Sequence, residues 1–251
     1  MVDLKNVFKS YGNKPIIEDV SLKIEKGTIT SFIGPNGAGK STLISMISRL
    51  ITRDQGDITI DGNDVLKTKN NELAKKISIL KQSNAINLKL TVRELVSFGR
   101  FPYSQGKLDK EDWEKVDEAI EYLELEEIQH KYLDQLSGGQ RQRAHIAMVV
   151  AQDTEYILLD EPLNNLDMRH ATQIMKTLRR LVDDMGKTIV IVIHDINFAS
   201  CYSDQIVALK DGKIVKQGRA CDVIDTCVLK EIYDMDIDIQ EIDNKRICVY
   251  Y

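Results

Sequence analysis

A glycine-rich segment at residues 34–41 carries the pattern that most directly predicts chemistry in this chain. It reads G-P-N-G-A-G-K-S and fits the spacing G-x-x-x-x-G-K-[ST]. Glycines let the backbone approach a phosphate, the Lys40 ammonium can neutralise charge on the β- and γ-phosphates, and the Ser41 hydroxyl can ligate Mg²⁺. We therefore expect this segment to bind the phosphates of a nucleotide.

The residues on either side of this segment strengthen that interpretation. The aliphatic and β-branched run at 30–33 predicts a buried strand, and the apolar-periodic run at 42–47 predicts a helix. This order aims backbone N–H groups and the positive end of the helix at a phosphate, whereas the alternative is a glycine-rich turn without a ligand. The predicted cradle comprises Gly34, Pro35, Asn36, Gly37, Ala38, Gly39, Lys40, Ser41 and Thr42.

Two adjacent carboxylates follow a second buried run, at residues 156–159. Alternation along a strand is expected to point Asp160 and Glu161 to opposite sides, which allows them different roles. We expect Asp160 to hold Mg²⁺ through water and Glu161 to polarise an attacking water. Strands often end in acidic residues, so the pair is strong evidence only beside a phosphate-binding loop.

The segment L-S-G-G-Q at 136–140 places a hydroxyl and two glycines at the start of a predicted helix at 141–151. It is typical of a second helix N-terminus that faces a phosphate. A third buried run, at 188–193, leads directly into His194. Because ligands bind outside the carboxyl ends of parallel strands, we expect the three strand ends to converge on one crevice.

The elements that position these residues predict an α/β fold. The first thirty residues and 57–62 alternate apolar and polar residues, as antiparallel strands do, and 206–215 reads as a hairpin with an Asp-Gly turn. Between about 83 and 135 the spacing becomes helical, and we expect Trp113, Val116, Ile120 and Leu123 to pack one helix face. The prediction is one domain over 1–251: a P-loop NTPase core with a mixed, partly parallel sheet, an N-terminal antiparallel β subdomain and an inserted helical subdomain.

The composition and net charge limit the classes of partner that this chain is expected to bind. The 251 residues carry a net charge of −5, which gives no support to an electrostatic grip on nucleic acid or anionic lipid. The longest apolar run, at 189–193, is far shorter than the roughly 18 residues that a spanning helix needs. We expect a cytosolic chain, unless a partner holds it at a membrane.

Together, the Walker A segment at 34–41, LSGGQ at 136–140 and ILLDEP at 157–162 resemble the ATP-binding subunit of an ABC transporter. The resemblance implies ATP and Mg²⁺ as ligands and a second copy of the chain as partner. Each nucleotide then contacts the Walker A segment of one copy and Ser137, Gly138, Gly139 and Gln140 of the other. It also implies in-line attack of water on the γ-phosphate, with Glu161 as general base.

The same resemblance assigns further roles by position. Tyr11 matches the aromatic residue that stacks on adenine, and Gln82 matches the glutamine that reaches Mg²⁺ and the attacking water. Asp167 matches an aspartate that contacts the other subunit, although Asn165 departs from the small residue more common in that loop. His194 matches the histidine that senses the γ-phosphate, whereas His130, His145 and His170 match no catalytic position and are interpreted as surface or structural residues.

The transported substrate is suggested by residues 90–103, which resemble ATPases of ferric-siderophore, haem and cobalamin importers. Residues 104–107 and 161–168 look most like ATPases of iron-siderophore systems, including those for petrobactin and related catecholates. The resemblance implies a peripheral subunit on the cytoplasmic face of the membrane. Its permease would dock on 91–103 through Arg100 and Phe101, and an extracytoplasmic substrate-binding protein would be an indirect partner. The alternatives are a haem or cobalamin importer, an exporter, and an ABC ATPase that acts on a soluble partner.

Overall fold

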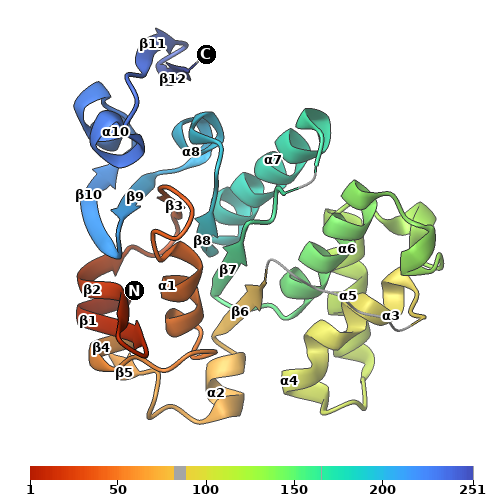
Figure 1. Ribbon diagram of the computed structural model, residues 1–251. Coiled ribbons are helices and arrows are strands. Elements are labelled where there is room, and N and C mark those ends of the chain that lie inside the picture. The colour runs from red at the N-terminus through yellow and green to blue at the C-terminus, as the bar shows by residue number, and fades with distance from the viewer. Residues whose placement is uncertain (82–88, 165, 251) are drawn as a thin grey trace. The chain divides into compact units, whose positions relative to one another are not determined.

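The structure is a computed structural model that describes residues 1–81, 89–164 and 166–250. These residues form two compact units (Figure 1). Unit 1 comprises Met1–Thr68 and Thr188–Tyr251, and unit 2 comprises Lys69–Lys187. Segments from both ends of the chain therefore build unit 1.

An antiparallel sheet forms the first part of unit 1, at the red end of the colour scale in Figure 1. In strand β1, the side chains of Val2, Leu4 and Val7 are at most 1% exposed. A shift in the pairing register between Leu4 and Val7 accounts for the break in their alternation. The sheet confirms the predicted antiparallel N-terminal part. In spatial order its strands are β2 (Lys14–Ile24), β1 (Val2–Tyr11), β4 (Gln55–Ile60) and β5 (Asn63–Asp64).

A second sheet of unit 1 has β3 (Ile29–Ile33) between two parallel neighbours, β8 and β9. All five β3 residues are buried, as expected for a parallel strand that is covered on both faces. Asp211 and Gly212, with φ of 48° and 77°, make the tight turn of the predicted hairpin. In spatial order these strands are β10 (Lys213–Arg219), β9 (Gln205–Lys210), β3 and β8 (Thr188–Val192).

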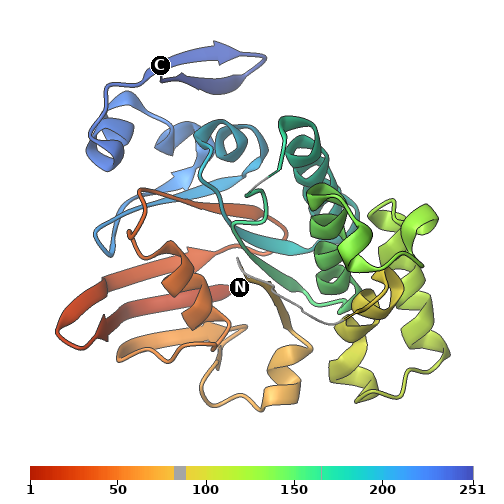
Figure 2. The same cartoon turned by 45° about the vertical axis from the view of Figure 1, so that its right-hand side comes forward.

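The C-terminal part of unit 1 packs against the end of β3. Ile33, the last residue of β3, shares an apolar cluster with Leu229, Ile232 and Cys248. The C-terminal hairpin lies beside α8 in Figure 2, where the Cys248 N–H donates to Asn197 Oδ1 at 2.7 Å. The remaining elements of unit 1 are α1 (Lys40–Ile47), α8 (Ile196–Tyr202), α9 (Ala220–Val223), α10 (Thr226–Tyr233), β11 (Asp238–Ile242) and β12 (Lys245–Val249).

Unit 2 combines a pair of parallel strands with most of the helices (Figure 1). The strands are β6 (Ile77–Leu80) and β7 (Tyr156–Asp160), and every β7 residue is buried. The helices in chain order are α2 (Asn70–Ala74), α3 (Val92–Ser97), η1 (Phe98–Arg100), α4 (Phe101–Ser104), α5 (Lys110–Tyr122), η2 (Glu126–Ile128), η3 (Leu133–Gln135), α6 (Gly138–Ala151) and α7 (Met168–Met185).

Helices α3, α5 and α6 pack on one another within unit 2. Val116 and Ile120 on the predicted apolar face of α5, and Leu123 at its C-cap, are at most 2% exposed. Trp113 is 37% exposed instead, and the Arg93 guanidinium lies 4.9 Å from its ring centroid. Three of the four predicted packing residues are therefore in the core, and the fourth is at its edge.

These elements confirm the α/β class with parallel and antiparallel strands. The division into one domain with an insertion at about 83–135 stays a prediction. Within the described residues, none of the helices combines the length and the apolar character that a membrane span requires.

Candidate functional site

The loop between β3 and α1 has the backbone of a phosphate cradle. Gly34, Gly37 and Gly39 have φ of 140°, 82° and 99°, values that residues with a Cβ rarely adopt. Gly39 is the N-cap of α1, and no side chain caps this helix. Successive N–H groups in such a turn, with the positive end of a helix behind them, form a concavity for anions.

Two of these glycines are also required by close packing. A Cβ on Gly34 would lie 2.0 Å from the carbonyl oxygen of Leu209 in β9. A Cβ on Gly39 would lie 2.5 Å from Ile17 Cδ1 and 2.9 Å from the carbonyl oxygen of Ile16. The loop therefore packs closely against β9 and β2, and these strands determine its shape.

Lys40 is the first residue of α1 and is only 4% exposed. Its ammonium donates to the carbonyl oxygens of Gly34 at 2.7 Å and Pro35 at 2.9 Å, so it is folded over the loop. Phosphate oxygens are stronger acceptors than neutral carbonyls, because the hydrogen bond is then charge-assisted on both sides. The loop and Lys40 thus fit the polyphosphate of a nucleotide, and Ser41 follows in the first turn of α1.

Gly212 and Tyr233, far along the chain, contact this loop, and no motif in the sequence marks them for this role. The Gly212 N–H in the β9–β10 turn donates to the Ala38 carbonyl at 3.2 Å, and the Gly212 carbonyl accepts from the Glu18 N–H at 2.9 Å. The Gly34 N–H donates to the Tyr233 hydroxyl at 3.1 Å. Burial raises the pKa of Tyr233 to about 12, so this hydroxyl is neutral at physiological pH.

Two further predicted residues lie in unit 1. His194 follows β8 closely and is exposed, and β8 pairs in parallel with β3, with Val192 opposite Phe32. His194 and the loop after β3 therefore leave the same edge of the sheet. Tyr11 ends β1, is 52% exposed, and has the Lys9 ammonium 5.7 Å from its ring centroid.

The two predicted carboxylates lie in unit 2, where β7 ends at Asp160. Asp160 is 5% exposed, whereas Glu161 is half-buried and has a left-handed φ of 54°. A turn, rather than the expected strand alternation, thus separates the two side chains. The Asn164 amide donates to Glu161 Oε2 at 2.5 Å. Eleven other non-glycine residues of the described chain also have positive φ, so this angle by itself marks a turn.

The predicted signature segment forms the start of α6. Ser137 is its N-cap, and its hydroxyl accepts from the Gln140 N–H at 3.3 Å. In return, Gln140 Oε1 accepts from the Ser137 N–H at 3.1 Å, which completes a capping box. The spacing S-x-x-Q indicates this capping box in the sequence, beside the predicted phosphate site.

Asp167 is the N-cap of α7, and its carboxylate accepts from the His170 N–H at 2.9 Å. Hydrogen bonds from the backbone and ring of His170 lower the pKa of Asp167. Gln82 and Asn165 lie outside the described residues. The structure thus groups Tyr11, the cradle and His194 in unit 1, and groups the carboxylates, the signature segment and Asp167 in unit 2. Convergence of all three strand ends stays a prediction.

Arg100 differs from its expected role. Its side chain is 4% exposed and forms an ion pair with Asp112, with Nε 2.9 Å from Oδ1. It also donates to the carbonyl of Ala151 at 3.0 Å. Arg100 therefore holds unit 2 together, and the expectation that it offers its guanidinium to a partner is wrong. Phe101, the next residue, is 61% exposed.

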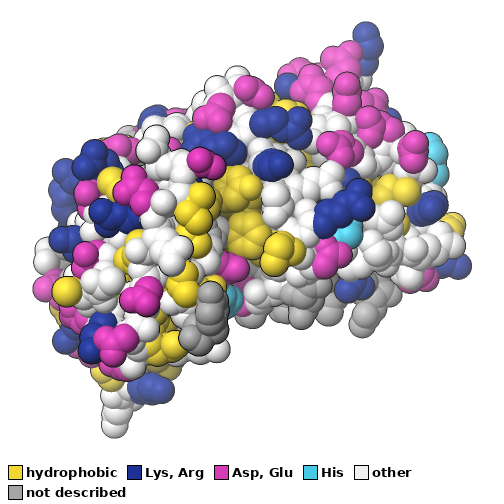
Figure 3. Space-filling model, turned by 90° about the horizontal axis from the view of Figure 1, so that it is seen from above, with side chains coloured by type: hydrophobic (Ala, Val, Ile, Leu, Met, Phe, Trp, Pro, Cys, Tyr) yellow, Lys and Arg dark blue, Asp and Glu magenta, His cyan; other side chains and the backbone are white. Residues whose placement is uncertain are grey.

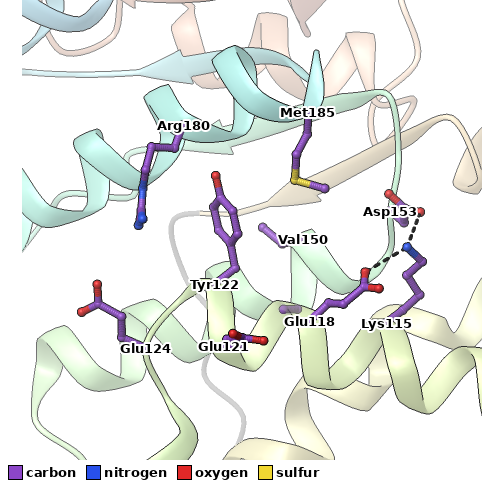
Figure 4. Close-up of a pocket in the computed structure, with 10 residues that line it drawn as sticks. Lys115, Glu118, Glu121, Tyr122, Glu124, Val150, Asp153, Arg180 and Met185 are labelled. Carbon is purple, nitrogen blue, oxygen red and sulfur yellow. Dashed lines mark hydrogen bonds and ion pairs between the residues drawn. The ribbon is translucent and has the colours of Figure 1, made fainter.

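One hollow of unit 2 lies away from the predicted site residues, whereas Gln140 and His170 are among the residues that line another. A cavity of about 410 Å³ in unit 2 is lined by Lys115, Tyr122, Arg180 and Met185 among others, and no predicted site residue lines it (Figure 4). Within the described residues, no cluster of three or more His, Cys, Asp and Glu side chains could hold a metal ion. Basic and acidic side chains are interspersed over the face drawn in Figure 3.

Comparison with known proteins identifies the family. A family model described as "ABC transporter" matches residues 17–164 of this chain. The chain belongs to the ABC transporter ATPase family. It is 65% identical over 251 residues to petrobactin import ATP-binding protein YclP of Bacillus subtilis (strain 168), with 100% of both chains covered. It is 49% identical over 250 residues, again with 100% of both covered, to petrobactin import ATP-binding protein FatE of Bacillus anthracis.

A solved structure agrees with this assignment. The dimeric ATP-binding cassette MJ0796, bound to ADP and Pi, matches with a TM-score of 0.78 and 36% identity. The match covers 88% of this chain and 99% of that chain. As an ABC transporter ATPase, the chain binds ATP and couples its hydrolysis to transport, and the predicted family and fold class are confirmed.

Proposed function

We propose that this chain powers a membrane importer of ferric siderophores, with a petrobactin-type catecholate as the cargo. The observation that carries the proposal is the full-length identity of 65% to a protein named for petrobactin import. Cargo contacts belong to other subunits of such a transporter, so this chain contributes the energy for the cycle. We place it on the cytoplasmic face of the membrane as a peripheral subunit.

In this function the cradle of residues 34–42 binds the phosphates of ATP, and Tyr11 stacks on the adenine. Lys40 exchanges its carbonyl acceptors for phosphate oxygens, which are better acceptors for an ammonium. Ser41, Asp160 and Gln82 would hold Mg²⁺. When bound, this ion neutralises charge on the β- and γ-phosphates.

Glu161 is the proposed general base. The left-handed turn after β7 presents its carboxylate outside the strand, and the amide of Asn164 fixes one of its oxygens. Glu161 accepts a proton from water as the water oxygen bonds to the γ-phosphorus and the bond to the bridging oxygen breaks. Gln82 orients this water, and His194 senses the γ-phosphate.

A second copy of the chain would complete each site. Ser137, Gly138, Gly139 and Gln140 would close on the nucleotide held by the partner, and Asp167 would contact the partner directly. The dimeric MJ0796 cassette bound to ADP and Pi supports this arrangement. We also propose that 1–251 is one nucleotide-binding domain in which about 83–135 is an inserted helical subdomain.

Transport itself tests the proposal. We would purify the chain with any multi-span permease encoded beside its gene, reconstitute both in vesicles with an extracytoplasmic binding protein, and supply ATP on the side of the chain. Uptake of ferric petrobactin that exceeds uptake of haem and cobalamin is the expected result. Uptake of haem or cobalamin alone would move the chain to another importer class, and outward transport would make it an exporter. Absence of any permease partner would favour an ABC ATPase with a soluble partner.

Docking on the permease is assigned to residues 91–103, and two neighbouring side chains provide a matched test. Phe101 is exposed, so Phe101→Ala should weaken co-purification with the permease and leave thermal unfolding unchanged. Arg100→Ala should do the reverse, because it leaves Asp112 buried without its cation. A Phe101 variant that unfolds early and still co-purifies would remove this residue from the interface.

A further inference from the structure

His170, which matched no expected catalytic position, contacts the Asp167 carboxylate. Its Nδ1 lies 2.8 Å from both Oδ1 and Oδ2, and its backbone N–H donates to Oδ1 at 2.9 Å. Because a carboxylate only accepts, Nδ1 carries a proton in this arrangement. The side chain of Asp167 is 64% exposed, so these bonds define the direction in which an otherwise solvated carboxylate points.

The same imidazole ring touches the signature segment. Gly139 is buried, and a Cβ at this position would lie 2.8 Å from Cγ and from Cδ2 of His170 and 3.3 Å from its Cβ. Only glycine leaves room for the ring, since contacts below 3.0 Å do not occur without a shift. Gly139 therefore allows α6 to approach the first turn of α7.

One ring thus joins two elements that our proposal directs at the partner subunit. We propose that His170 is a positioning residue that locks Asp167 to the signature helix, so that both meet the second copy as one rigid body. This inference rests on the proposed ATP-bound dimer. The ring is suited to the task because Nδ1 donates to the carboxylate while Cγ and Cδ2 lie against the bare backbone of Gly139.

Variants can separate these two contacts. His170→Phe keeps the flat ring and removes the donor, His170→Asn keeps a short donor and removes the ring, and His170→Ala removes both. We expect each to lower kcat for ATP hydrolysis in the permease complex, by roughly tenfold for His170→Ala, because a charge-assisted hydrogen bond is lost. KM for ATP should change little, since the ring is no part of the cradle. His130→Ala is the matched control, because His130 is an exposed histidine of the same unit.

A double-mutant cycle tests the direct contact with the signature helix. Gly139→Ala alone forces the new methyl group against the His170 ring. In a His170→Ala background both ring contacts are absent and only the contact with the Cβ of residue 170 at 3.3 Å remains, so adding Gly139→Ala should reduce kcat much less than it does in the wild type. If the two losses multiply, Gly139 acts without His170 and the proposed link is overturned.

A measurement without ATP separates this inference from the proposed function. The ring resonances of His170, followed by NMR of the isolated chain, should move in Asp167→Asn and in Gly139→Ala. Unchanged signals in both variants would show that the contacts do not form, whatever the activity. If the NMR data show the contacts in the wild type, the positioning role is overturned when His170→Ala keeps full kcat. It is also overturned when earlier thermal unfolding of His170→Ala explains its loss of kcat. Intact contacts in a wild-type complex that neither hydrolyses ATP nor dimerises would overturn the proposed function and this role with it.

Discussion

Two helix starts that look alike in the sequence are built in opposite ways. Helix α1 begins after a glycine N-cap with no side-chain cap, and its loop is shaped by packing against β2 and β9. Helix α6 begins with Ser137 and Gln140, which cap each other's backbone. The first start leaves N–H groups for a ligand to satisfy, whereas the second satisfies part of its own.

This difference indicates different tasks for the two sites. A helix start shaped from outside can bind phosphate tightly by itself, because its donors are preorganised. A self-capped start keeps its form without a ligand, but its hydroxyl can still donate a hydrogen bond. We therefore expect α1 to bind ATP in the single chain, and α6 to contribute only when a nucleotide is presented by a second copy.

Removing the cation of the first helix start should have the largest effect. Lys40→Ala deletes the ammonium that folds over the loop, and ATP turnover should fall by at least about 100-fold. Lys187→Ala is the control, because Lys187 is another mostly buried lysine, paired with Asp153, in unit 2 and outside the loop. Turnover and nucleotide affinity measured on both variants decide the matter. Equal losses would mean that Lys40 supports the fold and not the phosphates.

A variant that binds ATP without hydrolysing it should hold the start of α1 in one copy against the start of α6 in another. Glu161→Gln keeps the shape of the side chain and removes its basicity, so hydrolysis should fall by about 100-fold or more while ATP binding persists. Persisting ATP should then hold α1 of one copy against α6 of another, and a dimer should appear on size-exclusion chromatography only with ATP. Glu155→Gln, a change before β7 and not after it, is the control. A monomeric Glu161→Gln variant that retains ATP would separate α6 from the nucleotide.

The capping box of α6 has a matched counterpart in α3. Ser137→Ala and Thr91→Ala each delete an N-cap hydroxyl from a complete capping box. Each should lower the free energy of unfolding by about 1 kcal/mol, as measured in urea. Only Ser137→Ala should also lower ATP turnover of the chain measured without its permease. If both variants lose turnover equally, Ser137 is only a cap.

The smallest expected effect is that of acid on the free energy of unfolding, and it should act through α6 and not through α1. Burial, with a smaller contribution from the charge of Arg141, lowers the pKa of His145 in α6 below its usual value of 6.5, whereas α1 contains no histidine. The stability contributed by neutral His145 is complete above pH 6.5. It declines as pH falls below 6.5, because the unfolded chain takes up the proton first. The unfolding free energy of His145→Gln should therefore depend less on pH between 6.5 and 5 than that of the wild type, with His130→Ala as control.

The elements of the fold were largely predictable because they follow from local patterns. The buried run of β3, the Asp-Gly turn at residue 212 and the apolar face of α5 are each encoded within a few residues. The prediction for Arg100 was wrong because the sequence does not show which of two adjacent helical residues faces solvent. Neighbours on a helix face different directions, and here Phe101 is exposed whereas Arg100 is buried. Only the packed structure shows that Asp112, twelve residues later, removes it from the surface.

Site residues were predictable where they belong to compact motifs and not where they act through tertiary contacts. The cradle and the carboxylates at 160 and 161 each form one continuous segment. His170 carries no sign of its contact with Gly139, which lies 31 positions earlier, because that contact exists only when α6 and α7 meet. The capping box of Ser137 and Gln140 was readable from its spacing but was overlooked.

The distance along the chain between the cradle and its supports has a consequence for synthesis. Residues 34–41 are translated early, yet the donor from Gly212 and the hydroxyl from Tyr233 arrive much later, the latter 199 positions after Gly34. A nascent chain that has left the ribosome only to residue 200 carries the complete glycine motif without the contacts that shape it. The nucleotide pocket is thus finished only once residue 233 has been translated, and a chain that stops before it is poorly equipped to capture ATP.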